Sequence, residues 1–162
     1  EVNLTTECMV AASKHDGLSV IEVLVNCMIF NNGTHKAFAG DKEVRAEHTI
    51  TLRQGEKMLF GKNMDKGLML DNMKLKVVTV GENGVTLDDI LVHDAHEKDT
   101  MVHVMLASMK YPDFPVALGI IRDVAEPTYE REVARQIAEV QATAKIKNVD
   151  DLLNSGETWE VE

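Results

Sequence analysis

The sequence is poor in cysteine, in aromatic side chains and in positive charge. Two cysteines, Cys8 and Cys27, are too few for a disulfide scaffold, and alone they cannot complete a four-thiolate site. Aromatic residues make up 4% of the 162 residues, whereas the gap-filling residue methionine occurs 9 times. The formal net charge is −10, which disfavours nucleic acid as a partner because an acidic surface repels phosphate.

Long apolar runs are also missing. No stretch has the length of a membrane span, and the N-terminus lacks the charged-then-apolar pattern of a signal peptide. The hydrophobic fraction of 44% and the charged fraction of 27% are ordinary for a globular domain of this length with a real core. We therefore expect a cytoplasmic protein in a reducing compartment, with no membrane partner.

The first quarter of the chain predicts half of a βαβ unit. A helix is expected over residues 5–15, capped by Thr5 or Thr6 and ended by Gly17. The stretch 18–25, "LSVIEVLV", is an almost continuous apolar run, as in a strand of a parallel sheet that is buried on both faces. Helix, glycine turn and buried strand are typical of α/β folds.

The middle of the chain is less regular. Residues 31–73 contain scattered Gly, Asn, Asp and Lys with weak periodicity, which predicts short strands or irregular loops that cover another surface. Residues 74–80 alternate and predict a strand, and Thr86 is expected to cap a helical turn within 85–94.

The last third alternates helix and strand. We expect a helix over 99–110 capped by Asp99, a buried strand over 116–124, a helix over 127–144, and a short capped helix over 148–156. Residues 158–162 are a tail. The prediction is an α/β fold with two central strands, 18–25 and 116–124, a smaller β-rich insertion, and helices outside.

Two polar clusters have simple alternatives to a functional role. His93 and His96 are spaced as metal ligands on one helical face would be, but they lie in an expected loop without an evident third ligand. Lys62 and Lys66 lie between glycines and could attract phosphate, but the spacing is not that of a P-loop. A solvated turn and a lysine-decorated hairpin are the alternatives.

The cysteines differ in their setting. Cys8 lies inside the first expected helix and is interpreted as a small buried hydrophobic residue. Cys27 comes just after the expected strand 18–25, at the edge where open α/β sheets hold their ligands. The residues alone leave two interpretations of Cys27 open, a buried strand-end cysteine and a ligand.

Several long segments together resemble one enzyme family. They resemble the β subunits of 2-oxoacid:ferredoxin oxidoreductases over most of residues 14–130. The order of the segments and the residues within them are most similar to the 2-oxoglutarate branch. The segments are "GLSVIEVLVNCMIFNNGT", "EKMLFGKNMDKGLML", "KLKVVTVGENGVTLDDILVHD" and "MKYPDFPVALGIIRDVAEPTYE". The first of these resembles the end of a thiamine-diphosphate-binding, transketolase-like parallel-sheet domain.

The resemblance implies an activity and a role for one residue. These enzymes oxidatively decarboxylate a 2-oxoacid with coenzyme A and pass electrons through a [4Fe–4S] cluster to ferredoxin. The β subunit holds the cluster, thiamine diphosphate and Mg²⁺, and works with an α subunit. Cys27 matches the family's fourth cluster ligand, although Asn26 stands where the family often has proline.

The resemblance also implies what the chain would need. It lacks the family's magnesium-diphosphate segment and the three other cluster cysteines, so we expect a C-terminal portion that alone binds no cofactor and is inactive. Its parts would be 1–35, the end of the thiamine domain; 36–100, a covering segment; and 101–162, closing helices and strand. The alternative is a non-catalytic assembly or binding module derived from that subunit.

Overall fold

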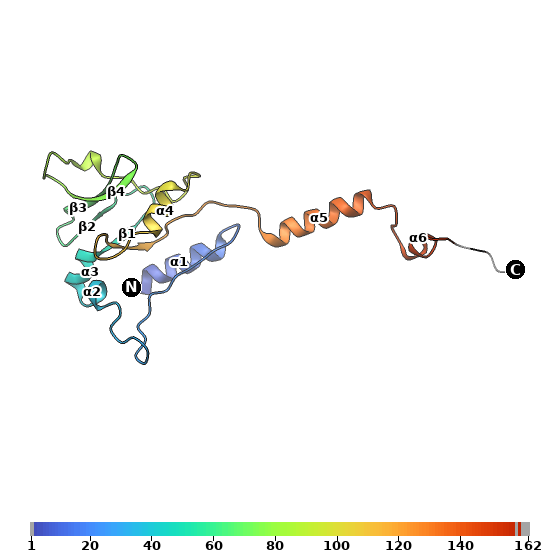
Figure 1. Ribbon diagram of the computed structural model, residues 1–162, viewed down its shortest axis with the longest axis horizontal. Helices are drawn as coiled ribbons and strands as arrows, with labels where there is room; N and C mark the ends of the chain where they lie inside the picture. The colour runs from blue at the N-terminus through green and yellow to red at the C-terminus, as the bar shows by residue number, and fades with distance from the viewer. Residues whose placement is uncertain (1, 158, 160–162) are drawn as a thin grey trace. The chain divides into compact units, whose positions relative to one another are not determined.

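The computed structural model describes residues 2–157 and 159, which form two compact units. The first unit comprises Glu1–His15 and Ser19–Val124, and the second comprises Asp16–Leu18 and Ala125–Glu162. In chain order the first unit contains α1 (Val2–Lys14), α2 (Lys36–Ala39), α3 (Lys42–His48), β1 (Thr49–Leu52), β2 (Leu59–Phe60), β3 (Lys66–Asp71), β4 (Lys74–Thr79), the 3₁₀ helix η1 (Leu87–Asp89), α4 (Met101–Ala107) and β5 (Val116–Gly119). The second contains α5 (Tyr129–Thr143) and α6 (Val149–Leu153). The predicted α/β class is confirmed, since the first unit combines helices with a parallel and an antiparallel sheet (Figure 1).

The parallel sheet is a pair of strands, β1 and β5. Their register runs from Thr49 opposite Val116 to Leu52 opposite Gly119. At this last pair the backbones approach closely, because a Cβ on Gly119 would lie 2.6 Å from the carbonyl oxygen of Leu52. Gly119 also has a φ of +99°, a conformation that favours glycine. The end of the parallel pair therefore requires glycine at this position.

The predicted strand 18–25 is wrong. Residues 18–26 have no strand assignment, and Leu18 and Val20 are 86% and 85% exposed. A strand needs a neighbour for its backbone N–H and C=O groups. Within the described residues, β5 pairs with β1, which lies in the region expected to contain short strands or irregular loops. The expected strand 116–124 is also shorter, since pairing ends at Gly119.

The antiparallel sheet, in the order β2–β3–β4, agrees with the sequence-based prediction better than the parallel pair does. The strand expected over 74–80 is β4, and it pairs with β3 along its full length. The two residues between them, Asn72 and Met73, have φ values of +47° and +62°, as a tight hairpin turn with two left-handed residues requires. The expected helical turn is η1, where the N–H and hydroxyl of Thr86 both donate to the Asp89 carboxylate.

The core of the first unit joins the two sheets and α4. The buried apolar cluster consists of Ile50, Leu52, Met58, Phe60, Leu68 and Leu106. Aliphatic and methionine side chains dominate it, in line with the scarcity of aromatic residues. Helix α4 lies within the range expected for it, and the Asp99 carboxylate accepts the Met101 N–H. The expected N-terminal helix is α1, but it begins at Val2, so Thr5 and Thr6 lie inside it rather than at its cap.

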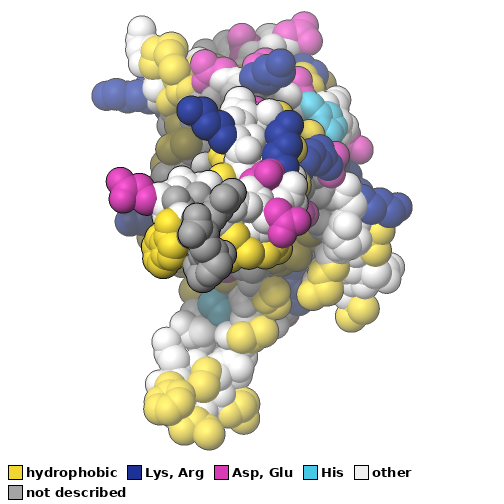
Figure 2. Space-filling model, turned by 90° about the vertical axis from the view of Figure 1, so that its right-hand side faces the viewer, with side chains coloured by type: hydrophobic (Ala, Val, Ile, Leu, Met, Phe, Trp, Pro, Cys, Tyr) yellow, Lys and Arg dark blue, Asp and Glu magenta, His cyan; other side chains and the backbone are white. Residues whose placement is uncertain are grey.

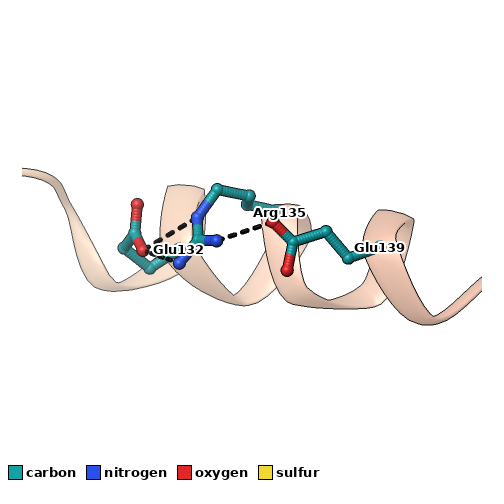
Figure 3. A network of polar contacts seen from close by, with 3 residues as sticks. All are labelled: Glu132, Arg135 and Glu139. Carbon is teal, nitrogen blue, oxygen red and sulfur yellow. Dashed lines mark hydrogen bonds and ion pairs between the residues drawn. The ribbon is translucent and has the colours of Figure 1, made fainter.

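The second unit consists of two helices with exposed apolar side chains. Helix α5 lies within the expected range 127–144, and Arg135 bridges Glu132 and Glu139 along its surface (Figure 3). Its expected apolar stripe includes Ile137 and Val140, which are both exposed. The short capped helix expected next is α6, and the structure identifies Asn148 as its N-terminal cap, whose side chain accepts the Asp151 N–H. Of the expected tail 158–162, only residue 159 lies among the described residues. Across all of the described residues, no helix is long and apolar enough to cross a membrane.

Candidate functional site

Cys27 lies in a tight turn that its own backbone closes. It forms an isolated antiparallel bridge with Asn31, whose N–H donates to the Cys27 carbonyl at 3.1 Å. The N–H of Phe30 points at the thiol sulfur, with the nitrogen 3.4 Å from Sγ. The turn therefore places the thiol against backbone N–H groups, and the side chain is neither buried nor fully exposed.

The side chain of Asn26 organises the loop around this turn. Its Oδ1 accepts the N–H of Gly33 at 2.7 Å, and its Nδ2 donates to Oδ1 of Asn32 at 3.1 Å. A proline at this position could make neither bond, because it has no side-chain polar group. Asn26 thus ties the start of the turn to the loop that follows it.

The turn favours the charged form of the Cys27 thiol. The backbone N–H of Phe30, followed by that of Ile29, lowers the pKa of the Cys27 thiol, and the N–H of Asn31 adds to this effect. Desolvation acts in the opposite direction but is smaller than the two leading hydrogen bonds. Since the thiolate is the form that binds metals, the surroundings of Cys27 suit a ligand better than a buried thiol.

The tip of the same turn is apolar and exposed. Met28, Ile29 and Phe30 follow Cys27, and Phe30 is 91% exposed. Figure 2 shows hydrophobic side chains gathered at the lower end of the molecule, where Figure 1 draws the turn of this segment. The backbone N–H groups that face the Cys27 thiol therefore lie next to an exposed apolar tip.

The described residues supply Cys27 with no further ligands. No group of three or more His, Cys, Asp and Glu side chains in residues 2–157 and 159 could hold a metal ion. A metal site at His93 and His96 is therefore not supported. The His93 Nε2 lies 2.8 Å from the Ile120 carbonyl oxygen and the His96 Nδ1 lies 2.7 Å from that of Asp123.

The two lysines singled out as phosphate-binding candidates are paired within the chain. Lys62 Nζ lies 3.0 Å from a carboxylate oxygen of Glu43, and Lys66 pairs with Glu47, both carboxylates being on α3. The Glu47 carboxylate also accepts the Lys62 N–H. These contacts favour the lysine-decorated hairpin over a phosphate site.

The sequence did not predict a pocket of about 180 Å³ at the carboxyl ends of β1 and β5. Its lining includes Leu52 and Gly119, the last residues of the two strands, together with Cys8 and His96. The interpretation of Cys8 as fully buried is wrong, because it is only partly covered. The β-branched stretch "TITL" before the "RQG" turn is the signal that could have identified β1, and with it this strand edge.

The comparison with known proteins gives one relative along nearly the whole chain. The chain is 31% identical over 163 residues to the 2-oxoglutarate oxidoreductase subunit KorB of Mycobacterium tuberculosis. The chain is similar to a C-terminal portion of a KorB-like subunit. The match covers 99% of this chain and 43% of KorB, so the chain spans less than half the length of this curated relative. No protein-family model and no solved structure matches it.

The similarity to KorB confirms the predicted family resemblance. It extends through both units, including α5 and α6, and is not confined to the segments between 14 and 130 that carried the prediction. The role of Cys27 is not tested by this comparison, and it rests on the geometry of the turn.

Proposed function

We propose that this KorB-like chain is part of the β subunit of a 2-oxoacid:ferredoxin oxidoreductase, and that Cys27 is the fourth ligand of its [4Fe–4S] cluster. The similarity to KorB over 99% of the chain supports the subunit. The single observation that carries the site is the turn of backbone N–H groups that face the Cys27 thiol. The preferred 2-oxoacid is 2-oxoglutarate, the substrate named for the relative.

The residues around Cys27 fit an iron–sulfur cluster as one ligand of four. A cluster of this type is held by four thiolates, and N–H groups directed at the sulfurs raise its reduction potential. The Phe30 N–H is placed to do this, and the apolar tip from Met28 to Phe30 would limit the access of water. The other three thiolates come from the rest of the β subunit.

The exposed apolar stretch before Cys27 supports the same assembly. Residues 18–25 have the composition of a doubly buried strand but lie exposed and unpaired among the described residues. In the complete subunit residues 1–35 form the end of a transketolase-like domain, and the rest of that domain covers this stretch. Residues 36–100 then cover the cluster, and 101–162 close the subunit.

The complete enzyme converts a 2-oxoacid and coenzyme A into an acyl-CoA and carbon dioxide. When bound in the complete β subunit, thiamine diphosphate and Mg²⁺ would supply the decarboxylation chemistry, and a cluster would supply one-electron transfer, with ferredoxin as the acceptor of the electrons released. The α subunit completes the site. This chain contributes the Cys27 thiolate, its N–H donors and the apolar cover, which hold and shield the electron-transfer group.

Iron and sulfide analysis of the anaerobically purified complex, with complete β and α subunits, tests the assignment. We expect Cys27→Ser to lose the cluster's iron, sulfide and electron paramagnetic resonance signal, because serine is a poor cluster ligand. Cys8→Ser is the matched control, since it removes the other thiol of the chain, and it should retain all three.

Two outcomes would separate the proposal from its rival. If the complex keeps its cluster after Cys27→Ser, Cys27 is not a ligand and only the family assignment stands. If the chain assembles with its partners but the complex holds no iron at all, the non-catalytic assembly module is the better description.

A further inference from the structure

Residues 120–124, here termed the exit segment, are the last part of the first unit before the second unit resumes at residue 125. They form no strand, yet they are held by the loop 93–98 and the start of α4. The hydrogen bonds are Asp123 N–H to the Ala95 carbonyl at 2.8 Å, His93 Nε2 to the Ile120 carbonyl at 2.8 Å, His96 Nδ1 to the Asp123 carbonyl at 2.7 Å, and Arg122 to the Glu97 carbonyl at 2.8 Å. Two of the groups involved in this attachment, His93 and His103, are buried imidazoles.

His93 fits this attachment only as a neutral ring. A carbonyl oxygen can only accept, so the Nε2 of His93 must carry the hydrogen that it donates to Ile120. In the neutral ring Nδ1 is then unprotonated, and this atom is buried without a hydrogen-bond partner among the described residues. The side chain is 1% exposed, so a proton added at Nδ1 would create a buried cation with an unmatched donor.

His103 is neutral for a different reason. Its Nε2 lies 2.8 Å from the Asp94 carbonyl oxygen and therefore carries the hydrogen. Its Nδ1 lies 3.1 Å from a guanidinium nitrogen of Arg122, which can only donate. A proton on Nδ1 would place two donors and two positive charges against each other at a ring that is 4% exposed.

We propose that His93 is a protonation-sensitive clamp, which holds the exit segment beside the contact of His103 with Arg122 while the His93 ring is neutral and releases the segment when that ring is protonated. The input of this switch is the proton, and its output is the release of the exit segment. This property is independent of the cluster and of the proposed enzyme activity.

The charges facing the clamp act in both directions. Burial lowers the pKa of His93, and the neighbouring His103 and His96 rings lower it further. The Asp94 carboxylate and the hydrogen bond to Ile120 raise the pKa of His93, but by less than burial lowers it. Arg122 and the ring of His93 face His103, and the Asp123 carboxylate is occupied by His15 at 2.7 Å.

The direction in which pH affects the clamp follows because the His93 ring must be neutral for the clamp to hold. In the released state the His93 ring titrates near the ordinary histidine value of about 6.5, whereas in the clamped state burial lowers the pKa of His93. The clamp is therefore fully favoured above about pH 6.5 and weakens as the pH falls. Below that pH, and while the clamped His93 ring stays neutral, the ratio of clamped to released forms falls roughly tenfold per pH unit.

Nuclear magnetic resonance of the ¹⁵N-labelled 162-residue chain tests the proposal between pH 8 and pH 5. Long-range ¹H–¹⁵N spectra should show both rings as neutral Nε2–H tautomers at pH 7.5. Amide exchange, corrected for its intrinsic pH dependence, should show the Asp123 N–H losing protection about tenfold or more by pH 5. The Leu68 N–H, bonded to the Met58 carbonyl in the same unit, is the control and should stay protected.

His93→Gln separates the clamp from general acid sensitivity. The glutamine amide reaches the position of Nε2 and can still donate to Ile120, but it does not titrate. The pH dependence of Asp123 protection should be lost, whereas His35→Gln, outside the clamp, should leave it unchanged. The proposal is overturned if Asp123 protection does not depend on pH, if either ring carries Nδ1–H at pH 7.5, or if Leu68 loses protection in parallel.

Discussion

Replacement of Gly119 by alanine should cost more stability than the same change at another left-handed glycine. Gly119 has a φ of +99°, and an added Cβ would meet the Leu52 carbonyl oxygen at 2.6 Å. Gly81 has a φ of +90° with nothing within 4 Å of its Cβ position, so it carries the backbone strain without the close contact. Comparing Gly119→Ala with Gly81→Ala therefore isolates the approach of β5 to β1.

The magnitude follows from the two contributions. A left-handed alanine costs about 1–2 kcal/mol, and both variants share this cost. At Gly119 the contact must also open by about 0.8 Å to reach the 3.4 Å at which ordinary contact begins. The neighbouring atom belongs to a backbone, so the parallel pair must separate at its end. Leaving one backbone group unsatisfied there adds about 1–3 kcal/mol.

Urea unfolding followed by circular dichroism measures the difference. With a slope of about 1–3 kcal/mol per molar urea, the midpoint of Gly119→Ala should lie roughly 1 M below that of Gly81→Ala. Equal midpoints for the two variants would refute the close approach of the strands. A midpoint of Gly81→Ala far below that of the parent chain would instead show that strain alone dominates.

Two further predictions concern the core and α3. Leu68 is completely buried, so Leu68→Ala should lower the free energy of unfolding by about 2–5 kcal/mol in the same assay, and a loss below 1 kcal/mol would contradict the assigned core. The Lys66 ammonium holds the pKa of the Glu47 carboxyl below its ordinary value of 4.5, so its contribution is present above that pH and is lost as the pH falls through the folded-state value. Glu47→Gln should therefore be less stable than the parent at pH 7, and a stability gap that stays constant down to pH 3 would exclude this ion pair.

Local sequence signals determined a large part of the fold. The alternation in residues 74–79, the cap at Asn148 and the apolar spacing in 129–143 each specify an element through contacts within a few residues. These elements could be predicted from their amino-acid sequence because local hydrogen bonds and side-chain spacing suffice to define them. The family resemblance was also present in the sequence, and the similarity to KorB confirms it.

Pairing between strands is where prediction from the sequence failed. The apolar run 18–25 looks more like a central strand than the four residues of β1, yet β1 is the strand that pairs with β5. Composition measures how well a segment tolerates burial, whereas a strand also needs a neighbour for its backbone. That neighbour is supplied by tertiary structure, over a separation of more than sixty residues between Thr49 and Val116.

The sequence by itself determined the α/β class, the resemblance to KorB-like subunits and the choice of Cys27 as the residue to test. Only the tertiary structure decided the surroundings that give individual residues their chemistry. The N–H groups around Cys27 come from the closure of a turn, and the neutral state of His103 depends on Arg122, nineteen residues away. A side chain's protonation and reactivity depend on the dipoles and charges within a few ångströms, and folding, rather than the order of residues, sets those neighbours.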